Sequence, residues 1–224
     1  MVGRSNVGKS SLINALMRRP VARTSATPGK TRLINLYRVV TPPTGPFYLV
    51  DLPGYGYTRG PQDAKQEFDR LATMYFARAM PTSSGVRSPK SEVRPPTSDT
   101  GHRTPDHAIR PTPIGVLLAL DARHPGMESD LATLRWLRDR GFGPGRARRP
   151  AGAQYVGPLH IVVTKTDKLS RNERAKALDR FEQLCEEPVL AVSAATGEGL
   201  EDLWKRITSW AASLAANSRP RSRP

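Results

Sequence analysis

The chain has 224 residues, which is enough for one α/β domain of about 150 to 200 residues with additional segments. A single cysteine excludes an internal disulfide, and the absence of any run of 18 apolar residues argues against a membrane-spanning helix. The net charge of +15 is unevenly distributed, since residues 1–50 contain eight Lys or Arg and no acidic residue. This basic excess favours a polyanionic partner over the alternative of a solvated surface with no such role.

Apolar runs typical of strands alternate along the chain with amphipathic stretches typical of helices. In chain order we expect a helix over Ser10–Met17, strands over Leu33–Val40 and Phe47–Asp51, a helix over Gln62–Arg78, a strand over Ile114–Asp121, a helix over Ser129–Arg140, a strand over Leu159–Thr164, a helix over Arg171–Cys185, a strand over Val189–Val192 and a helix over Leu200–Ala215. Most of these strands are continuously apolar, as in a parallel sheet covered on both faces, whereas Leu33–Val40 has the mixed polarity of an edge strand. The sequence therefore predicts an α/β fold with a doubly wound, mostly parallel sheet.

Three segments contain little that could be buried in a core. Residues 81–113 are rich in Pro, Ser, Thr and charge and predict a disordered insert. Residues 141–153 predict a basic flexible loop and residues 215–224 a basic tail, which leaves residues 1–214 as the folded domain. Because the insert carries five basic and three acidic residues, we favour a neutral insertion over an arm that contacts a partner.

Residues 3–10, GRSNVGKS, match the pattern G-x-x-x-x-G-K-[ST] at the start of the first expected helix. The glycines let the backbone wrap a phosphate, which successive N–H groups and the positive end of the helix would face. Lys9 would reach the β- and γ-phosphates of a nucleotide, and the Ser10 hydroxyl would ligate Mg²⁺. The alternative is a flexible turn before a helix. The predicted phosphate-binding residues are Gly3, Arg4, Ser5, Asn6, Val7, Gly8, Lys9, Ser10 and Ser11.

The segment TPGKT, residues 27–31, lies between this motif and the next one and is a candidate switch I. Thr31 would bring its hydroxyl to Mg²⁺ while a γ-phosphate is present. An ordinary loop is the alternative. The predicted ligand residues of this segment are Gly29, Lys30, Thr31, Arg32 and Leu33.

The segment DLPG, residues 51–54, directly follows an apolar strand. Its aspartate stands where a carboxylate holds the Mg²⁺ shell, and the N–H of Gly54 could bond the γ-phosphate and release it after hydrolysis. The whole segment, Asp51, Leu52, Pro53 and Gly54, is predicted to line the nucleotide. The predicted catalytic residues are Lys9, Thr31 and Gly54, and the predicted metal ligands are Ser10, Thr31 and Asp51.

The segment TKTD, residues 164–167, follows another apolar strand and matches the pattern [NT]KxD. The Asp167 carboxylate could accept hydrogen bonds from N1–H and the 2-amino group of guanine, a donor pair that adenine lacks, so this residue would select GTP over ATP. The stem of Lys165 could pack along the base, and the Ser193-Ala194 backbone could donate an N–H to the guanine O6. The predicted base-binding residues are Thr164, Lys165, Thr166, Asp167, Val192, Ser193 and Ala194.

Together these motifs are similar to those of a known family. The stretches GRSNVGKSSLIN, TSATPGKTRLIN, VDLPGYGY, TKTDKL and VSAATGEGLEDLW, with DARHPG after LLALD, resemble the EngB (YihA/YsxC) family of ribosome-biogenesis GTPases, of the TrmE-Era-EngA-EngB-Septin-like class. The resemblance implies a Ras-like fold and a monomer that binds GTP or GDP with Mg²⁺ and hydrolyses GTP. It also implies a role in assembling the large ribosomal subunit in contact with ribosomal RNA, a link to cell division and septation, and a place in the bacterial cytoplasm, with an organelle of bacterial descent as the alternative.

Two positions concern the rate of hydrolysis. Ras-type enzymes place a Gln directly after the DxxG motif to orient the attacking water, and Tyr55 occupies that position here. We therefore expect slow intrinsic hydrolysis that depends on a partner. The resemblance also places Asn6 where related GTPases use an asparagine to bind K⁺. We therefore hypothesise that a K⁺ ion near the α- and γ-phosphates takes the place of an arginine finger.

The P-loop begins at Gly3, with only Met1 and Val2 before it. Members of the resembled family carry a longer apolar strand there, so we expect the first central strand to be truncated. A loss of several buried apolar side chains at about 1.5 to 3 kcal/mol each would rival the stability of a domain, with weak folding and weak nucleotide affinity as the result.

That expectation defines the alternative function, a nucleotide-binding and RNA-binding module with little or no hydrolysis. A signalling or trafficking GTPase is a third hypothesis. The lack of a lipidation signal at the C-terminal end and the segment DLPGYGY argue against it.

Overall fold

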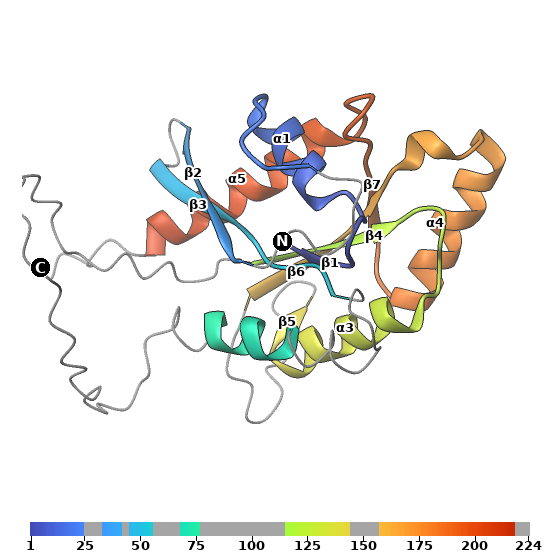
Figure 1. Ribbon diagram of the computed structural model, residues 1–224, viewed down its shortest axis with the longest axis horizontal. Helices are drawn as coiled ribbons and strands as arrows, with labels where there is room; N and C mark the ends of the chain where they lie inside the picture. The colour runs from blue at the N-terminus through green and yellow to red at the C-terminus, as the bar shows by residue number, and fades with distance from the viewer. Residues whose placement is uncertain (25–32, 42–44, 56–67, 77–114, 144–156, 218–224) are drawn as a thin grey trace, which may run out of the picture.

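The computed structural model describes residues 1–24, 33–41, 45–55, 68–76, 115–143 and 157–217, and the structural statements below concern these residues. Their main sheet is parallel and consists of β1 (Val2–Gly3), β4 (Val116–Asp121), β6 (Gly157–Thr164), β5 (Phe142–Gly143) and β7 (Val189–Ala191). The strands β2 (Asn35–Thr41) and β3 (Gly45–Asp51) form an antiparallel pair beside it (Figure 1).

The register of the sheet brings the candidate motifs to one edge. Gly3 pairs with Ala119, and Asp121 pairs with Thr164, so the carboxyl ends of β1, β4 and β6 lie side by side. The N–H of Leu52 donates to the Met1 carbonyl over 3.2 Å, which sets the end of β3 next to β1. Ligands of open parallel sheets bind at this edge.

Helices cover both faces of the sheet, as predicted. On one face α1 (Lys9–Met17) and α5 (Leu200–Asn217) pack with β2 and β3 around a buried cluster that includes Leu117, Val162 and Leu203. On the other face α3 (Glu128–Asp139), α4 (Arg171–Cys185) and a helical segment over residues 68–76 enclose a second cluster, with Leu118 and Leu134 among its members. Every residue of β4 is buried because the strand lies between these two layers, which explains its continuous apolar run.

Apart from the helix predicted over residues 62–78, of which residues 68–76 are described, the observed boundaries lie within two residues of the predicted ones, and the main difference is a strand that was not predicted. Phe142 begins β5 and is 1% exposed, so the segment expected as a flexible basic loop from residue 141 starts with a buried strand; residues 144–153 lie outside the described part. A two-residue strand is too short for sequence periodicity to reveal. Helix α5 continues to Asn217, beyond the predicted domain end at residue 214. The strand β1 consists of Val2 and Gly3, which agrees with the short first strand that was expected.

The insert predicted over residues 81–113 lies outside the described residues, so its disorder stays a prediction. None of the helices in the described part of the chain has both the length and the apolar character that crossing a bilayer requires.

Candidate guanine-nucleotide site

The segment 3–10 forms a tight turn between β1 and α1. Asn6 and Gly8 have left-handed backbone conformations, with φ of 62° and 104°, and α1 begins at Lys9. A side chain at Gly8 would meet nothing closer than 3.6 Å, so glycine is required there by the backbone conformation and not by crowding. Such a turn at a helix N-terminus directs successive N–H groups toward one point and is built to bind an anion.

The Lys9 side chain lies inside this turn. It is 6% exposed, and its Nζ donates to the carbonyl oxygens of Gly3, over 2.8 Å, and Arg4, over 3.0 Å. Burial lowers the pKa of Lys9 to about 8, although the nearby Asp51 carboxylate acts in the opposite direction. A phosphate beside Nζ would favour the charged form of this lysine.

The Asp51 carboxylate ends β3 close to α1. It is 1% exposed, Ser10 Oγ lies 3.5 Å from its Oδ2, and its buried Oδ1 has no hydrogen-bond partner among the described residues. Burial raises the pKa of Asp51, with Lys9 opposing. An orphaned carboxylate oxygen beside a hydroxyl fits Mg²⁺, which prefers oxygen ligands and usually takes only one or two from a protein. The two predicted metal ligands in the described part of the chain therefore lie together.

The DLPG backbone rests directly on the P-loop. The N–H of Ser5 donates to the Tyr55 carbonyl over 2.9 Å, and Arg4 and Tyr55 form a parallel β-bridge. Leu52 is 2% exposed and packs in the core, so only its backbone is available to a nucleotide.

Gly54 lies at the closest approach of the two loops. A Cβ at this position would lie 2.6 Å from Ser5 N and 2.9 Å from Lys9 Nζ. The Gly54→Ala substitution is therefore expected to push the two loops apart and lower GTP hydrolysis by about 100-fold, as removal of an aligned donor does. GDP affinity, which needs no contact with a γ-phosphate, should change only a few-fold. Single-turnover hydrolysis and GDP titration measure the two effects, and hydrolysis within twofold of wild type would contradict this account.

The TKTD segment is attached to the P-loop from the other side. Thr164 Oγ1 lies 2.6 Å from the Val7 carbonyl oxygen, and Lys165 Nζ donates to the Asn6 carbonyl. Lys165 has a φ of 59°, and this left-handed conformation turns its side chain back along the loop. The next residue begins the short helix η1 (Thr166–Lys168), where Thr166 Oγ1 donates to the Val192 carbonyl over 3.1 Å. These contacts tie three separate chain segments into one wall.

Asp167 lines a pocket of about 170 Å³. Ser193 Oγ donates to its Oδ1 over 2.7 Å, and Lys168 Nζ lies 3.2 Å from its Oδ2. The Ser193 hydrogen bond is the main cause that lowers the pKa of Asp167, so the carboxylate is ionised at neutral pH. The Ser193 N–H is engaged with the Glu198 carbonyl, which makes the adjacent Ala194 N–H the better candidate donor to a base. The pocket lining includes Gly8, Ser11, Leu12, Thr164, Lys165, Asp167, Lys168, Val192, Ala194 and Ala195.

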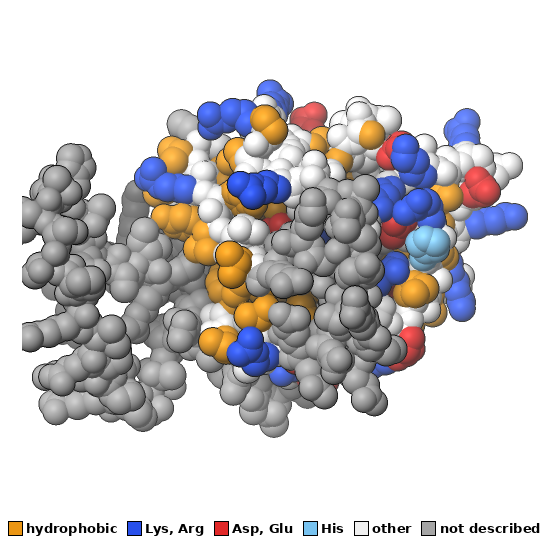
Figure 2. All heavy atoms as spheres, viewed as in Figure 1, with side chains coloured by type: hydrophobic (Ala, Val, Ile, Leu, Met, Phe, Trp, Pro, Cys, Tyr) orange, Lys and Arg blue, Asp and Glu red, His pale blue; other side chains and the backbone are white. Residues whose placement is uncertain are grey.

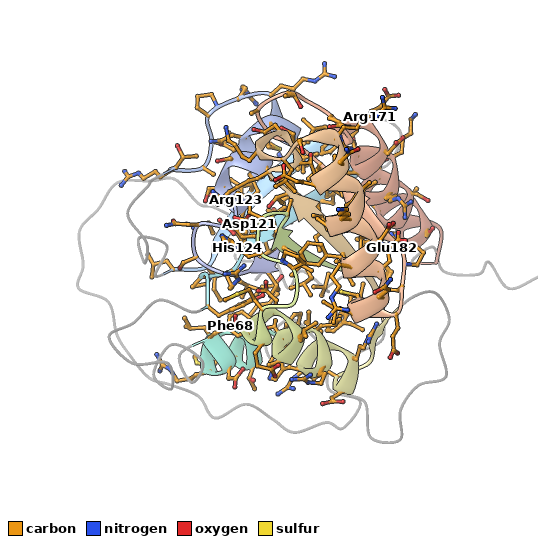
Figure 3. All side chains as sticks on the ribbon, turned by 90° about the vertical axis from the view of Figure 1, so that its right-hand side faces the viewer. Phe68, Asp121, Arg123, His124, Arg171 and Glu182 are labelled. Atoms are coloured by element: carbon orange, nitrogen blue, oxygen red, sulfur yellow. The ribbon has the colours of Figure 1, made fainter. Side chains whose placement is uncertain are left out.

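Asp121 and Arg123 belong to this site and were not among the residues predicted from the sequence. Asp121, at the end of β4 and 4% exposed, accepts from Lys165 Nζ over 3.0 Å and from Arg123 Nε and Nη2 over 2.9 and 2.8 Å (Figure 3). Burial would raise the pKa of Asp121, but these hydrogen bonds outweigh burial and hold the pKa well below its usual range. The sequence could have identified Asp121, because it ends an apolar strand in the same way as Asp51, the first residue of DLPG.

The predicted switch I residues are not placed. Gly29, Lys30, Thr31 and Arg32 lie outside the described residues, so their roles stay predictions. Leu33 is described and is 75% exposed.

Comparisons with known proteins agree with this geometry. A family model described as "50S ribosome-binding GTPase" matches residues 1–82. The "Probable GTP-binding protein EngB" of Geobacter sulfurreducens is 35% identical over 210 residues, covering 92% of this chain and 78% of that protein. The protein of the same name from Solibacter usitatus is 36% identical over 209 residues, with 93% and 83% covered.

Solved structures share the fold at lower identity. The crystal structure of a probable GTP-binding protein EngB superposes with a TM-score of 0.56 at 18% identity, covering 95% of this chain and 97% of that chain. Era in complex with MgGDPNP and nucleotides 1506–1542 of 16S ribosomal RNA gives a TM-score of 0.58 at 18% identity, with 100% of this chain and 56% of that chain covered. These likenesses confirm the Ras-like P-loop fold, and the sequence relatives fix the family: the chain belongs to the EngB family of GTP-binding proteins.

Proposed function

We propose that this protein binds GTP and Mg²⁺, hydrolyses GTP to GDP and phosphate, and acts as an assembly factor for the large ribosomal subunit. The observation that carries the proposal is the convergence of a lysine buried in the P-loop turn and an orphaned carboxylate at one sheet edge, beside a pocket that Asp167 lines. The name "50S ribosome-binding GTPase" of the matching family model, and membership of the EngB family, support the ribosomal part.

Each residue of the site has a role in this chemistry. Lys9 and the N–H groups of the P-loop would neutralise the phosphates, and Ser10, Asp51 and Thr31 would hold Mg²⁺, which supplies positive charge to the β- and γ-oxygens. The Gly54 N–H would orient the γ-phosphate. Asp167 would read the two donors of guanine, while the stem of Lys165 forms one side of the base pocket.

Intrinsic hydrolysis is expected to be slow. Tyr55 is 4% exposed and its hydroxyl donates to Asp130 over 2.9 Å, so it points into the core and cannot orient a water at the γ-phosphate. A partner and a K⁺ ion near Asn6 are proposed to supply the stabilisation of the transition state that Tyr55 cannot provide. The left-handed backbone of Asn6 belongs to the anion-binding turn itself, which would put such a cation close to the phosphates.

The polyanionic partner is proposed to be ribosomal RNA in the bacterial cytoplasm, bound by a monomer. The net charge of +15 supports this, and in Figure 2 blue Lys and Arg side chains outnumber red acidic ones over the visible face. The alternative, an RNA-binding module with little or no hydrolysis, has no specific observation in its favour.

The rate of phosphate release tests the proposal. Release should be slow for the protein alone and should rise at least about tenfold with large ribosomal subunits, since groups supplied by a partner stabilise the transition state. It should also be faster in K⁺ than in Na⁺ buffer at equal ionic strength. Equal rates with and without subunits and in both salts would contradict the proposed stimulation, and no release under any condition would contradict the enzyme itself.

A further inference from the structure

We infer that Asp130 is a positioning residue that couples the two phosphate-contacting loops, and that Tyr55 is the anchor through which it holds the DLPG loop. The inference rests on the proposed function, because it assigns a role in the handling of the γ-phosphate at the same site. Asp130 was not predicted as part of the site from the sequence, and Tyr55 was considered only as the residue at the position of a water-orienting glutamine.

The geometry joins three distant chain segments at one oxygen atom. Asp130 lies in the first turn of α3 and is 3% exposed. Its Oδ1 accepts from Arg4 Nε, the second residue of the P-loop, over 2.8 Å. The same oxygen accepts from the Tyr55 hydroxyl, directly after DLPG, over 2.9 Å. The P-loop and the DLPG loop are therefore fixed to a common point on α3.

The charge of this buried cluster is costly for the folded state. Burial raises the pKa of Asp130, with Arg4 and the Tyr55 hydrogen bond opposing, because an ionised carboxyl loses hydration at this position. Asp130 Oδ2 and Arg4 Nη2 are buried without a hydrogen-bond partner among the described residues. A cluster selected for stability alone would satisfy these atoms or replace them by apolar groups.

Tyr55 connects Asp130 to Gly54 and fixes the position of the Gly54 backbone. Its carbonyl oxygen accepts from Ser5 N–H over 2.9 Å, and its hydroxyl is held by Asp130, so both ends of the residue are fixed. Gly54, the preceding residue, fits against Ser5 with no room for a Cβ. Release of the hydroxyl would let the Gly54 N–H move relative to the P-loop, and this N–H is the group proposed to meet the γ-phosphate.

The Tyr55 ring has packing contacts that do not depend on its hydroxyl. It meets Phe68 edge-on with centroids 5.3 Å apart, and Phe68 lies 5.7 Å from Trp136 of α3. Figure 3 shows Phe68 on the helical segment beside α3. Tyr55→Phe therefore removes the hydrogen bond to Asp130 and keeps these ring contacts, which makes it the decisive variant.

The experiment compares Tyr55→Phe and Asp130→Asn with wild type in titrations of a non-hydrolysable GTP analogue and of GDP with Mg²⁺. Both variants should lose about tenfold in affinity for the analogue relative to GDP, the loss expected for one hydrogen bond to a charged group. The kcat for GTP should fall in parallel, and the double variant should lose less than the sum of the two single losses, because the contact between Tyr55 and Asp130 is common to both. Asp139→Asn, at an exposed position at the other end of the same helix, is the matched control and should leave all values unchanged.

The outcomes separate the inference from the proposed function. Equal losses for the GTP analogue and GDP, together with a lower melting temperature, would mean a structural role only and would overturn the inference. An unchanged analogue-to-GDP ratio in Tyr55→Phe would overturn it too, even if Asp130→Asn does not fold. Failure of the wild-type protein to bind the analogue or to hydrolyse GTP would instead contradict the proposed function.

Discussion

Replacement of Lys9 by alanine is expected to lower kcat/KM for GTP by about 100-fold to 1,000-fold, the usual cost of removing one preorganised charged donor from a reacting centre. Nζ of Lys9 lies inside the P-loop turn, 2.8 and 3.0 Å from two of its carbonyl oxygens, and no other lysine in the described residues is buried. Phosphate release at saturating and limiting GTP measures the effect.

The loss should not come from unfolding. Burial lowers the Lys9 pKa to about 8, so the charged form of this lysine is costly in the folded protein, and its removal offsets the lost attraction to Asp51. Lys176→Ala, at an exposed position on α4, is the control and should behave as wild type. Hydrolysis by Lys9→Ala at the wild-type rate would eliminate the enzyme that we propose.

Replacement of Asp167 by asparagine is expected to convert a preference for GTP into a preference for XTP. The ionised carboxylate accepts from N1–H and the 2-amino group of guanine, whereas xanthine carries a carbonyl oxygen in place of the amino group. The amide nitrogen of asparagine can donate a hydrogen bond to that oxygen. With guanine, the same amide nitrogen would face the 2-amino group, so that two donors meet and no hydrogen bond forms. Sites that pair buried polar groups discriminate by about 10⁴-fold, so GTP should lose at least about 100-fold and XTP should gain.

Competition between GTP and XTP in the hydrolysis assay measures this change of preference. Asp179→Asn, at an exposed position on α4, serves as the control. Equal losses for both nucleotides in Asp167→Asn would show damage to the pocket without a role in base selection. An unchanged preference for GTP would mean that Asp167 does not read the base.

The sequence predicted the sheet and its functional edge well, because both depend on local patterns. β4 and β6 end at Asp121 and Thr164 as expected, since a continuous apolar run can only be buried between two helical layers. The P-loop also follows from local chemistry, because Gly8 and the helix start at Lys9 set the turn by themselves.

Contacts between distant segments could not be predicted in the same way. The sequence showed that Tyr55 occupies the position of the water-orienting glutamine and cannot replace it, but the direction of its side chain depends on Asp130, 75 residues away. The hydrogen bond from Lys165 to Asp121 also joins residues that are 44 positions apart, and no local pattern predicts it. The strand at Phe142 was missed because its burial comes from pairing with β6 and not from a pattern of its own.

The most direct test of the central claim is the displacement of a fluorescent GDP from the wild-type protein by unlabelled GDP and ADP with Mg²⁺. GDP should displace the probe at a concentration at least about 100-fold lower than ADP does, because the Asp167 carboxylate in the pocket lining can accept from two donors of guanine that adenine lacks. Displacement by both nucleotides at the same concentration, or no binding of the probe at all, would contradict it.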